Sequence, residues 1–141
     1  MKLLDCTLRD GGYYNKWNFS EDLVEFYLDA VAKSGIEYIE LGYRGFPQKT
    51  YFGPFAYTTE RLINRLKLPL GPKYGVMVDA GVVIKREGSL RENVDNLFYS
   101  KSSSKLDFVR IACHFHEVKQ GVEIAVILKA KGYLVGLNLM Q

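Results

Sequence analysis

The sequence predicts an α/β fold in which the strands of a parallel sheet alternate with helices. Short apolar runs of strand length alternate along the 141 residues with longer stretches whose apolar residues recur at helical spacing. Strict alternation of this kind gives right-handed crossovers and a parallel sheet with buried central strands. Because 48% of the residues are hydrophobic, the chain can bury a sizeable core, and we expect one domain over residues 1–141.

The first half of the chain supplies two strands and two helices. An apolar opening before Arg9 is the first strand, and a loop follows it. Ser20 caps a helix that Gly35 ends, with an apolar stripe at Leu23, Phe26, Tyr27, Ala30 and Val31. The second strand is "YIELGYR" at 38–44. A second helix begins near Thr59 and packs through Leu62, Ile63 and Leu66.

The second half of the chain continues the alternation. "YGVMVDAG" at 74–81 is the third strand, and Ser89 with Glu92 forms a capping box that starts the third helix. "DFVRIAC" is the fourth strand. A helix with apolar positions at Val118, Val122, Ala125 and Val126 leads through Gly132 to the fifth strand, "YLVGLNLM". Two architectures suit this order: an open doubly wound sheet, or strands 1 to 5 of a TIM (β/α)₈ barrel.

Charge and composition exclude several classes of partner. The 19 Lys+Arg and 16 Asp+Glu residues give a net charge of +3 and are scattered along the chain, so we expect no nucleic-acid partner. The sequence shows no leader and no apolar run that spans a bilayer, so we expect a cytoplasmic protein with no membrane contact. Cys6 and Cys113 are far apart and are expected to be reduced, packed thiols.

Polar residues gather where the predicted strands end, and both candidate folds keep their chemistry there. Arg9 and Asp10 follow the first strand, Glu40 lies within the second, His114 follows the fourth and Gln141 the fifth. Glu40 interrupts an apolar run, so it needs either a partner or a chemical role.

Asp10 has two interpretations. A carboxylate followed by two glycines suits a ligand of Mg²⁺ or Mn²⁺ that a substrate approaches closely. Asp-Gly is equally a common turn dipeptide, and Arg9 has Glu40 available as a plain ion-pair partner.

The "HFH" stretch at His114 and His116 has the spacing of a metal-binding pair on a strand. Glu117 and the helical pattern after it indicate that the strand has already ended. We therefore favour a polar loop, or an individual substrate contact by His114, over a metal site.

Aromatic residues cluster in the two loops that follow the first and second strands. They are Tyr13, Tyr14 and Trp17, then Tyr51, Phe52, Phe55 and Tyr57. These rings are expected either to roof a pocket or to cover the end of the sheet or a subunit contact.

Four stretches resemble one enzyme family. "DCTLRDGG" resembles the D-[ST]-T-L-R-D-G signature of metal-dependent aldolases and Claisen-type enzymes, which include 4-hydroxy-2-oxovalerate aldolase, 3-hydroxy-3-methylglutaryl-CoA lyase and isopropylmalate synthase. "GIEYIELGYR" is similar to the family's second strand. "VRIACHF" and "VGLNLMQ" are similar to strands four and five of the 4-hydroxy-2-oxovalerate aldolase branch.

The resemblance implies a partial TIM barrel and a role for each matched residue. Arg9 would steady an enolate oxygen, Asp10 would bind Mn²⁺ or Mg²⁺, and Glu40 would lie near the reacting centre. His114 and Gln141 would contact substrate. The implied activity is a carbon–carbon lyase acting on a small 2-oxo acid such as pyruvate. An acyl-CoA/2-oxo acid condensing enzyme and a non-catalytic open-sheet binding domain stay as alternatives.

The chain departs from the family pattern at two places. Where the aldolase branch has a histidine base, this sequence reads "GYYNKWNF", and the H-x-H metal ligands of strand seven have no counterpart. We therefore expect part of a longer enzyme that is inactive alone. Because an open sheet leaves two strand edges unpaired, we expect either self-association or pairing with a missing C-terminal half-barrel.

Overall fold

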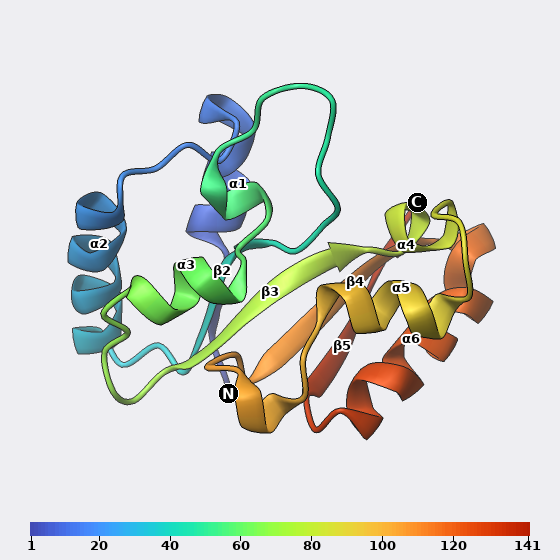
Figure 1. Ribbon diagram of the computed structural model, residues 1–141. Helices are drawn as coiled ribbons and strands as arrows, with labels where there is room; N and C mark the ends of the chain where they lie inside the picture. The colour runs from blue at the N-terminus through green and yellow to red at the C-terminus, as the bar shows by residue number, and fades with distance from the viewer.

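The computed structural model describes residues 1–141 as five parallel strands and their helical connections (Figure 1). The strands are β1 (Leu4–Asp5), β2 (Tyr38–Tyr43), β3 (Lys73–Asp79), β4 (Phe108–His114) and β5 (Leu134–Met140). The α-helices are α1 (Thr7–Asn15), α2 (Glu21–Lys33), α3 (Glu60–Arg65), α4 (Ala80–Ile84), α5 (Leu90–Leu97) and α6 (Val118–Ala130). Short 3₁₀ turns η1 (Pro54–Ala56), η2 (Lys101–Ser103) and η3 (Phe115–Glu117) lie between them.

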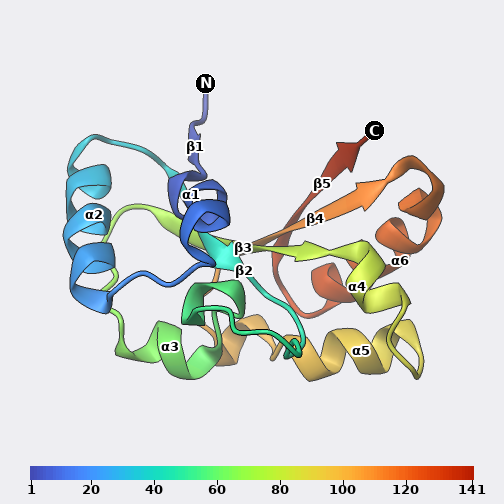
Figure 2. The same cartoon turned by 90° about the horizontal axis from the view of Figure 1, so that it is seen from above.

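The sheet is a half-barrel. Its strand order is β1-β2-β3-β4-β5, every neighbouring pair is parallel, and Figure 2 shows α2, α3, α5 and α6 around the outside of the curled sheet. The same view places β1 and β5 at the open side. This sequential order confirms the prediction of a partial TIM barrel and excludes the doubly wound order that a flavodoxin-like open sheet would have.

The core lies between the outer face of the sheet and the surrounding helices. Outward-facing strand residues pack against helix residues in one cluster of 26 buried side chains, which includes Ile39, Val76, Val109, Leu28 and Ile124. The strand residues between these outward-facing ones point to the other face of the sheet, which is the inner face of the half-barrel, because successive side chains of a strand alternate between faces. Because the central strands are buried on both faces, they read as nearly continuous apolar runs.

The strand register places Glu40 of β2 and Arg110 of β4 on the inner face of the half-barrel, at positions offset by two residues. Cα pairing aligns Glu40 with Gly75, Met77 with Arg110, and Arg110 with Gly136. β2 contains one more residue than β3 between its paired positions, so its register shifts between Glu40 and Tyr43. An extra residue of this kind changes which face the following side chains occupy, and it brings Tyr43 to the same side as Glu40.

The apolar stripes predicted for the first and last helices were partly wrong. In α2 the buried residues are Val24, Leu28 and Val31, whereas Leu23 and Phe26 are exposed. In α6 the buried residues are Gly121, Ile124, Ile127 and Leu128, and Val122 and Val126 are exposed. Both helices carry apolar residues on more than one side, so more than one set of residues has helical spacing. Which set is buried is decided by the side that packs against the sheet.

No helix has both the length and the apolar composition needed to cross a membrane.

Candidate active site

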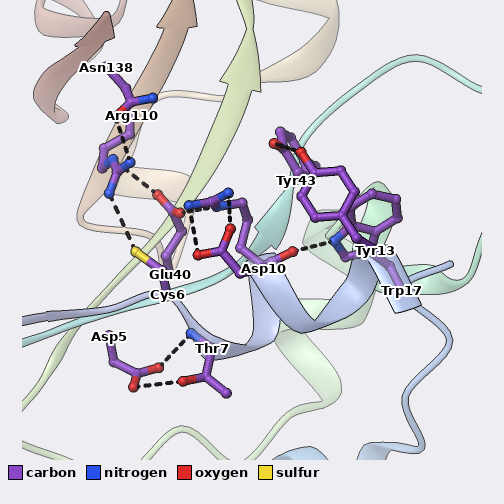
Figure 3. Close-up of polar contacts among 11 residues, drawn as sticks. Asp5, Cys6, Thr7, Asp10, Tyr13, Trp17, Glu40, Tyr43, Arg110 and Asn138 are labelled. Carbon is purple, nitrogen blue, oxygen red and sulfur yellow. Dashed lines mark hydrogen bonds and ion pairs between the residues drawn. The ribbon is translucent and has the colours of Figure 1, made fainter. Parts of the chain in front are cut away.

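Helix α1 places the R-D-G-G segment beside the inner face of the sheet. The Asp5 carboxylate accepts hydrogen bonds from the Thr7 backbone N–H and hydroxyl, both at 3.1 Å (Figure 3), so the chain turns from β1 directly into the helix. Arg9 and Asp10 lie in the first turns of this helix. The predicted loop after the first strand was wrong, and so was the alternative of an Asp-Gly turn.

The end of α1 is fixed by Trp17. Its backbone N–H donates to the Gly12 carbonyl at 2.9 Å, and its indole Nε1–H donates to the Arg9 carbonyl at 2.8 Å. The indole lies against Gly12 so closely that a Cβ there would be 1.9 Å from the Trp17 Cδ1 atom. Lys16 and Trp17 both have φ of 57°, in the left-handed region. This closure holds the turn of helix that carries Arg9.

A fully buried carboxylate organises the inner face. Glu40 has an exposed fraction of 0%, and its Oε1 accepts a hydrogen bond from Arg9 Nε at 2.7 Å. Its Oε2 lies 3.4 Å from Arg110 Nε, an ion-pair distance without hydrogen-bond geometry, so that oxygen accepts no hydrogen bond. Figure 3 shows Glu40 in contact with Arg110 on one side and with the α1 guanidinium on the other. Glu40 thus lies between two guanidiniums, Arg9 and Arg110.

Arg110 is held from two further directions. Its Nη1 donates to the Cys6 Sγ at 3.4 Å, and its Nη2 donates to the Asn138 Oδ1 at 3.1 Å (Figure 3). These contacts join β2, β4 and β5 with α1 and with Cys6, the residue that precedes α1. We call Arg9, Glu40 and Arg110 the central cluster.

The protonation states of these groups follow from burial and charge. Burial by itself lowers the pKa of Arg9, but the hydrogen bond and charge of Glu40 outweigh it, so the pKa of Arg9 is raised. Burial, and then the charge of Glu40, raise the pKa of the Cys6 thiol. Arg110 and Arg9 lower this pKa, but by less. At neutral pH the Arg9 guanidinium is therefore charged and the Cys6 thiol is protonated.

Asp10 lies at the edge of the central cluster. Its side chain is 59% exposed, one carboxylate oxygen pairs with Arg9 Nη1, and the other accepts a hydrogen bond from Arg9 Nη2 at 3.2 Å. The structure contains no group of three or more His, Cys, Asp or Glu side chains placed to hold a metal ion. A single exposed carboxylate that is already paired with an arginine does not fit Mn²⁺ or Mg²⁺, which take several oxygen ligands.

The two histidines and Gln141 lie outside the central cluster. β4 includes His114, one residue beyond the predicted strand, and η3 follows it, so the strand has ended before His116 as predicted. The rings of His114 and His116 stack, with centroids 5.7 Å apart, although the two residues do not share a strand. His114 is exposed, and Gln141 is exposed after the end of β5. Neither makes a hydrogen bond or ion pair with Arg9, Glu40 or Arg110.

Sequence analysis missed Arg110 and Tyr43 as members of the site. Arg110 interrupts the apolar run "DFVRIAC" as Glu40 interrupts "YIELG", so the reasoning applied to Glu40 would have found it. Tyr43 gave no such signal, because its position on the inner face depends on the register shift in β2. The Arg9 guanidinium lies 5.9 Å from the centre of the Tyr43 ring.

The aromatic residues divide between a pocket, the core and the surface. Tyr13, Trp17, Phe52 and Tyr57 line a pocket beside the central cluster. Phe55 is fully buried in the core, and Tyr14 and Tyr51 are exposed. Both expectations for these residues were thus partly right, since some rings form a pocket and others cover the end of the sheet.

Comparison with solved structures identifies the class of fold. The chain is similar to the N-terminal domain of a putative aldolase from Bacteroides vulgatus, a crystal structure, with a TM-score of 0.82 and 32% identity. The likeness covers 100% of this chain and 45% of the other chain, so this chain spans less than half of its length. No protein-family model and no curated protein matches the chain. The chain is an aldolase-like domain with the fold of a partial barrel.

Proposed function

We propose that the chain is the first half of a carbon–carbon lyase that cleaves or forms an aldol bond next to a 2-oxo acid, as 4-hydroxy-2-oxovalerate aldolase does. The central cluster is the observation that carries this proposal: a fully buried Glu40 holds Arg9 and Arg110 at the inner face of an aldolase-like half-barrel. Charged side chains replace the apolar residues that normally fill a barrel interior. Arg9 and Arg110 bring guanidinium N–H groups to this face, and such donors suit an anionic substrate and an anionic intermediate.

The chemistry follows from the donors that the cluster leaves available. Cleavage of an aldol beside a 2-oxo group leaves an enolate, whose oxygen carries the developing negative charge. Arg9 donates its Nε–H to Glu40, and its Nη1 and Nη2 atoms each contact one oxygen of Asp10. Each of these terminal nitrogens carries two N–H groups, so one N–H on each stays available for a substrate. A guanidinium fixed before the reaction stabilises such a charge without reorganisation. Arg110 adds a second positive charge on the opposite side of Glu40.

The family resemblance implies Mn²⁺ or Mg²⁺, but the ligands in this chain do not form a site for either. Asp10 is the one candidate ligand near the central cluster, and it is paired with Arg9. We therefore route no step through a metal ion. Arg9 carries the stabilisation of the enolate in this proposal.

We propose that further strands of a second half-barrel cover the open side of the sheet. β1 and β5 each have one unpaired edge, and Leu134, Leu137 and Leu139 of β5 are exposed. Unpaired apolar edges promote association. The matched aldolase chain is more than twice as long as this one, which favours a second half on the same polypeptide. Sedimentation of this chain as a stable dimer would instead favour self-association.

Calorimetric titration of pyruvate tests whether the central cluster binds a 2-oxo acid. We expect saturable binding to the wild-type chain with and without added Mn²⁺, and at least about tenfold weaker binding to Arg9→Lys, which keeps the charge but loses the planar fork. The matched control is Arg65→Lys, an arginine that is 51% exposed and pairs with Glu21 on the surface. That control should bind pyruvate as the wild type does.

Two results would count against parts of this proposal. If Arg9→Lys binds pyruvate as tightly as the wild type, the central cluster is not the 2-oxo acid site. If binding requires Mn²⁺ and disappears in Asp10→Asn, Asp10 is a metal ligand after all and the enolate is stabilised by the metal ion rather than by Arg9 alone.

A further inference from the structure

A pocket of about 360 Å³ lies beside the central cluster and is not used by the proposed function. It is formed by the end of α1, the segment after β2, η1 and the start of α4. Eight of its 12 lining residues are hydrophobic, and six carry aromatic rings: Tyr13, Trp17, Tyr43, Phe46, Phe52 and Tyr57. Its size and composition are those of a small-molecule site.

The pocket and the central cluster share two elements. Tyr13 and Trp17 come from α1, the helix that carries Arg9, and Trp17 donates its indole N–H to the Arg9 carbonyl. Tyr43 lines the pocket and also contacts the Arg9 guanidinium through its ring. Figure 3 shows Tyr13, Trp17 and Tyr43 grouped together next to Asp10. A molecule with a reacting carbon beside Arg9 can therefore extend directly into the pocket.

The pocket offers an oxygen-binding group among its rings. The hydroxyls of Tyr13 and Tyr43 lie 2.7 Å apart and form a hydrogen bond. Burial, and then the hydrogen bond with Tyr13, raise the pKa of Tyr43, so the Tyr43 phenol is protonated at neutral pH. A phenol hydroxyl both donates and accepts, which suits a hydroxyl or carbonyl oxygen of a ligand.

Charge around the rings favours a neutral ligand over a cation. Guanidiniums already lie over two of the rings, Arg9 over Tyr43 and Arg86 over Phe46 at 4.7 Å. Arg44 also lines the pocket. Against these, Asp79 is the one acidic lining residue, and its Oδ1 accepts a hydrogen bond from the Val82 N–H at 3.2 Å. A pocket whose walls are aromatic rings, and whose one carboxylate is already hydrogen-bonded, suits an uncharged aromatic ring of a ligand.

We propose that this pocket receives the ring of an aryl aldehyde, the carbonyl partner of the 2-oxo acid enolate. This inference rests on the proposed function and names its substrate class: 4-hydroxy-4-aryl-2-oxobutanoates. In cleavage the bond between C3 and C4 breaks, and its electron pair becomes the enolate of C2 and C3. The 4-hydroxyl loses its proton to water and becomes the aldehyde carbonyl. C3 takes up a proton from water, which gives pyruvate, and nothing is oxidised or reduced.

Trp17 gives a direct test of ring binding, because it is the single tryptophan of the chain and lines the pocket. Its indole N–H gives one signal in a ¹H–¹⁵N correlation spectrum. We expect benzyl alcohol, an unreactive analogue of an aryl aldehyde, to shift this signal saturably. Butanol and the cation benzyltrimethylammonium should shift it far less.

Variants connect the shift to the pocket. Ala56→Leu narrows the pocket from η1, and Tyr13→Ala removes one wall and the phenol; each should weaken binding by about tenfold or more. Tyr14→Ala is the matched control, since Tyr14 is the next residue of α1 and is 96% exposed. It should bind as the wild type does. Equal binding by wild type and Ala56→Leu, or tighter binding of the cation, would overturn the proposal.

Turnover by the longer enzyme that contains this chain separates the two proposals. Faster pyruvate release from the 4-aryl substrate than from its 4-methyl counterpart supports both. Release from the 4-methyl substrate alone overturns the aryl assignment and leaves the lyase proposal standing. If benzyl alcohol binds but neither substrate releases pyruvate, the lyase proposal and the aldehyde role fail, and ring binding by the pocket is a separate property.

Discussion

At the scale of single residues, two adjacent glycines in α1 differ in whether a side chain would fit at their position. Gly11 and Gly12 are both helical, and an interior glycine ordinarily costs a helix about 1 kcal/mol relative to alanine. A Cβ on Gly11 would have its nearest neighbour, Phe19 Cζ, at 3.8 Å, an ordinary contact. A Cβ on Gly12 would overlap the Trp17 indole at 1.9 Å. Packing against Trp17 therefore requires glycine at position 12. At position 11 there is room for a Cβ, so helix propensity decides the effect of a substitution there.

Alanine substitutions test this difference within one turn of helix. We expect Gly11→Ala to raise the free energy of unfolding by about 0.5–1 kcal/mol. Gly12→Ala should lower it by about 1–3 kcal/mol, because Trp17 must move. Denaturant unfolding followed by Trp17 fluorescence measures both. Equal effects of the two substitutions would contradict the packing of Trp17 on Gly12.

Glu40 is the residue on which the central cluster depends. Glu40→Gln removes the buried negative charge and leaves Arg9 and Arg110 close together without it, so we expect a loss of about 3 kcal/mol in unfolding free energy. Asp29→Asn breaks an exposed ion pair with Lys33 and should cost less than about 0.5 kcal/mol. A stable Glu40→Gln variant would mean that the two guanidiniums do not need Glu40.

Sequence reasoning identified Arg9, Asp10 and Glu40 as neighbours, because carboxyl ends of parallel strands meet at one rim. The structure brings these three together. Sequence reasoning did not predict that Asp10 would be exposed and paired with Arg9. The direction of these side chains depends on α1, and this segment was predicted to be a loop. Sequence reasoning missed Tyr43 because the register shift in β2 has no sequence signature.

At the scale of elements, α5 begins with the capping box that the sequence predicts. Ser89 Oγ accepts a hydrogen bond from the Glu92 N–H at 3.2 Å, and the Glu92 carboxylate accepts one from the Ser89 N–H at 2.8 Å. The hydrogen bonds from the Ser89 backbone N–H and then its hydroxyl lower the pKa of Glu92. A lowered pKa in the folded state means that this carboxylate stabilises the fold only while it is ionised.

The stability of α5 should therefore depend on pH in a defined direction. At about pH 7, Ser89→Ala should cost about 1 kcal/mol of unfolding free energy. Glu92→Gln should also destabilise the protein there, and its difference from wild type should shrink as the pH falls from about 4.5 through the lowered pKa of Glu92. Urea unfolding of both proteins at neutral and acidic pH measures this. A difference that grows on acidification would contradict the capping box.

Element order and type could be predicted from sequence more fully than helix orientation. The later strand runs and the helix starts at Ser20, Thr59 and Ser89 are local signals that lie where predicted. The first strand is shorter than predicted, because Thr7 and Leu8 belong to α1. The buried faces of α2 and α6 could not be chosen, because both helices carry apolar residues on several sides. Helix α4 was not predicted. It begins where Asp79 caps it directly after β3.

At the scale of the whole molecule, a sequential half-barrel carries its polar groups on a face that further strands would enclose. The central cluster and its contact with Asn138 join β2, β4 and β5 with α1, and the aromatic pocket opens beside it. The strand order follows from the βα alternation and the family resemblance together, since alternation alone left an open sheet possible.

The release of pyruvate from 4-hydroxy-2-oxo acids by the longer enzyme that we propose contains this chain tests the central claim most directly. The account predicts pyruvate release that falls by at least about a hundredfold in Arg9→Lys and is unchanged in Arg65→Lys, because a fixed guanidinium stabilises the enolate. No pyruvate from any 4-hydroxy-2-oxo acid, together with turnover of an acyl-CoA and a 2-oxo acid, would contradict it and assign the enzyme to the condensing class. Full activity of Arg9→Lys would contradict the role of the central cluster.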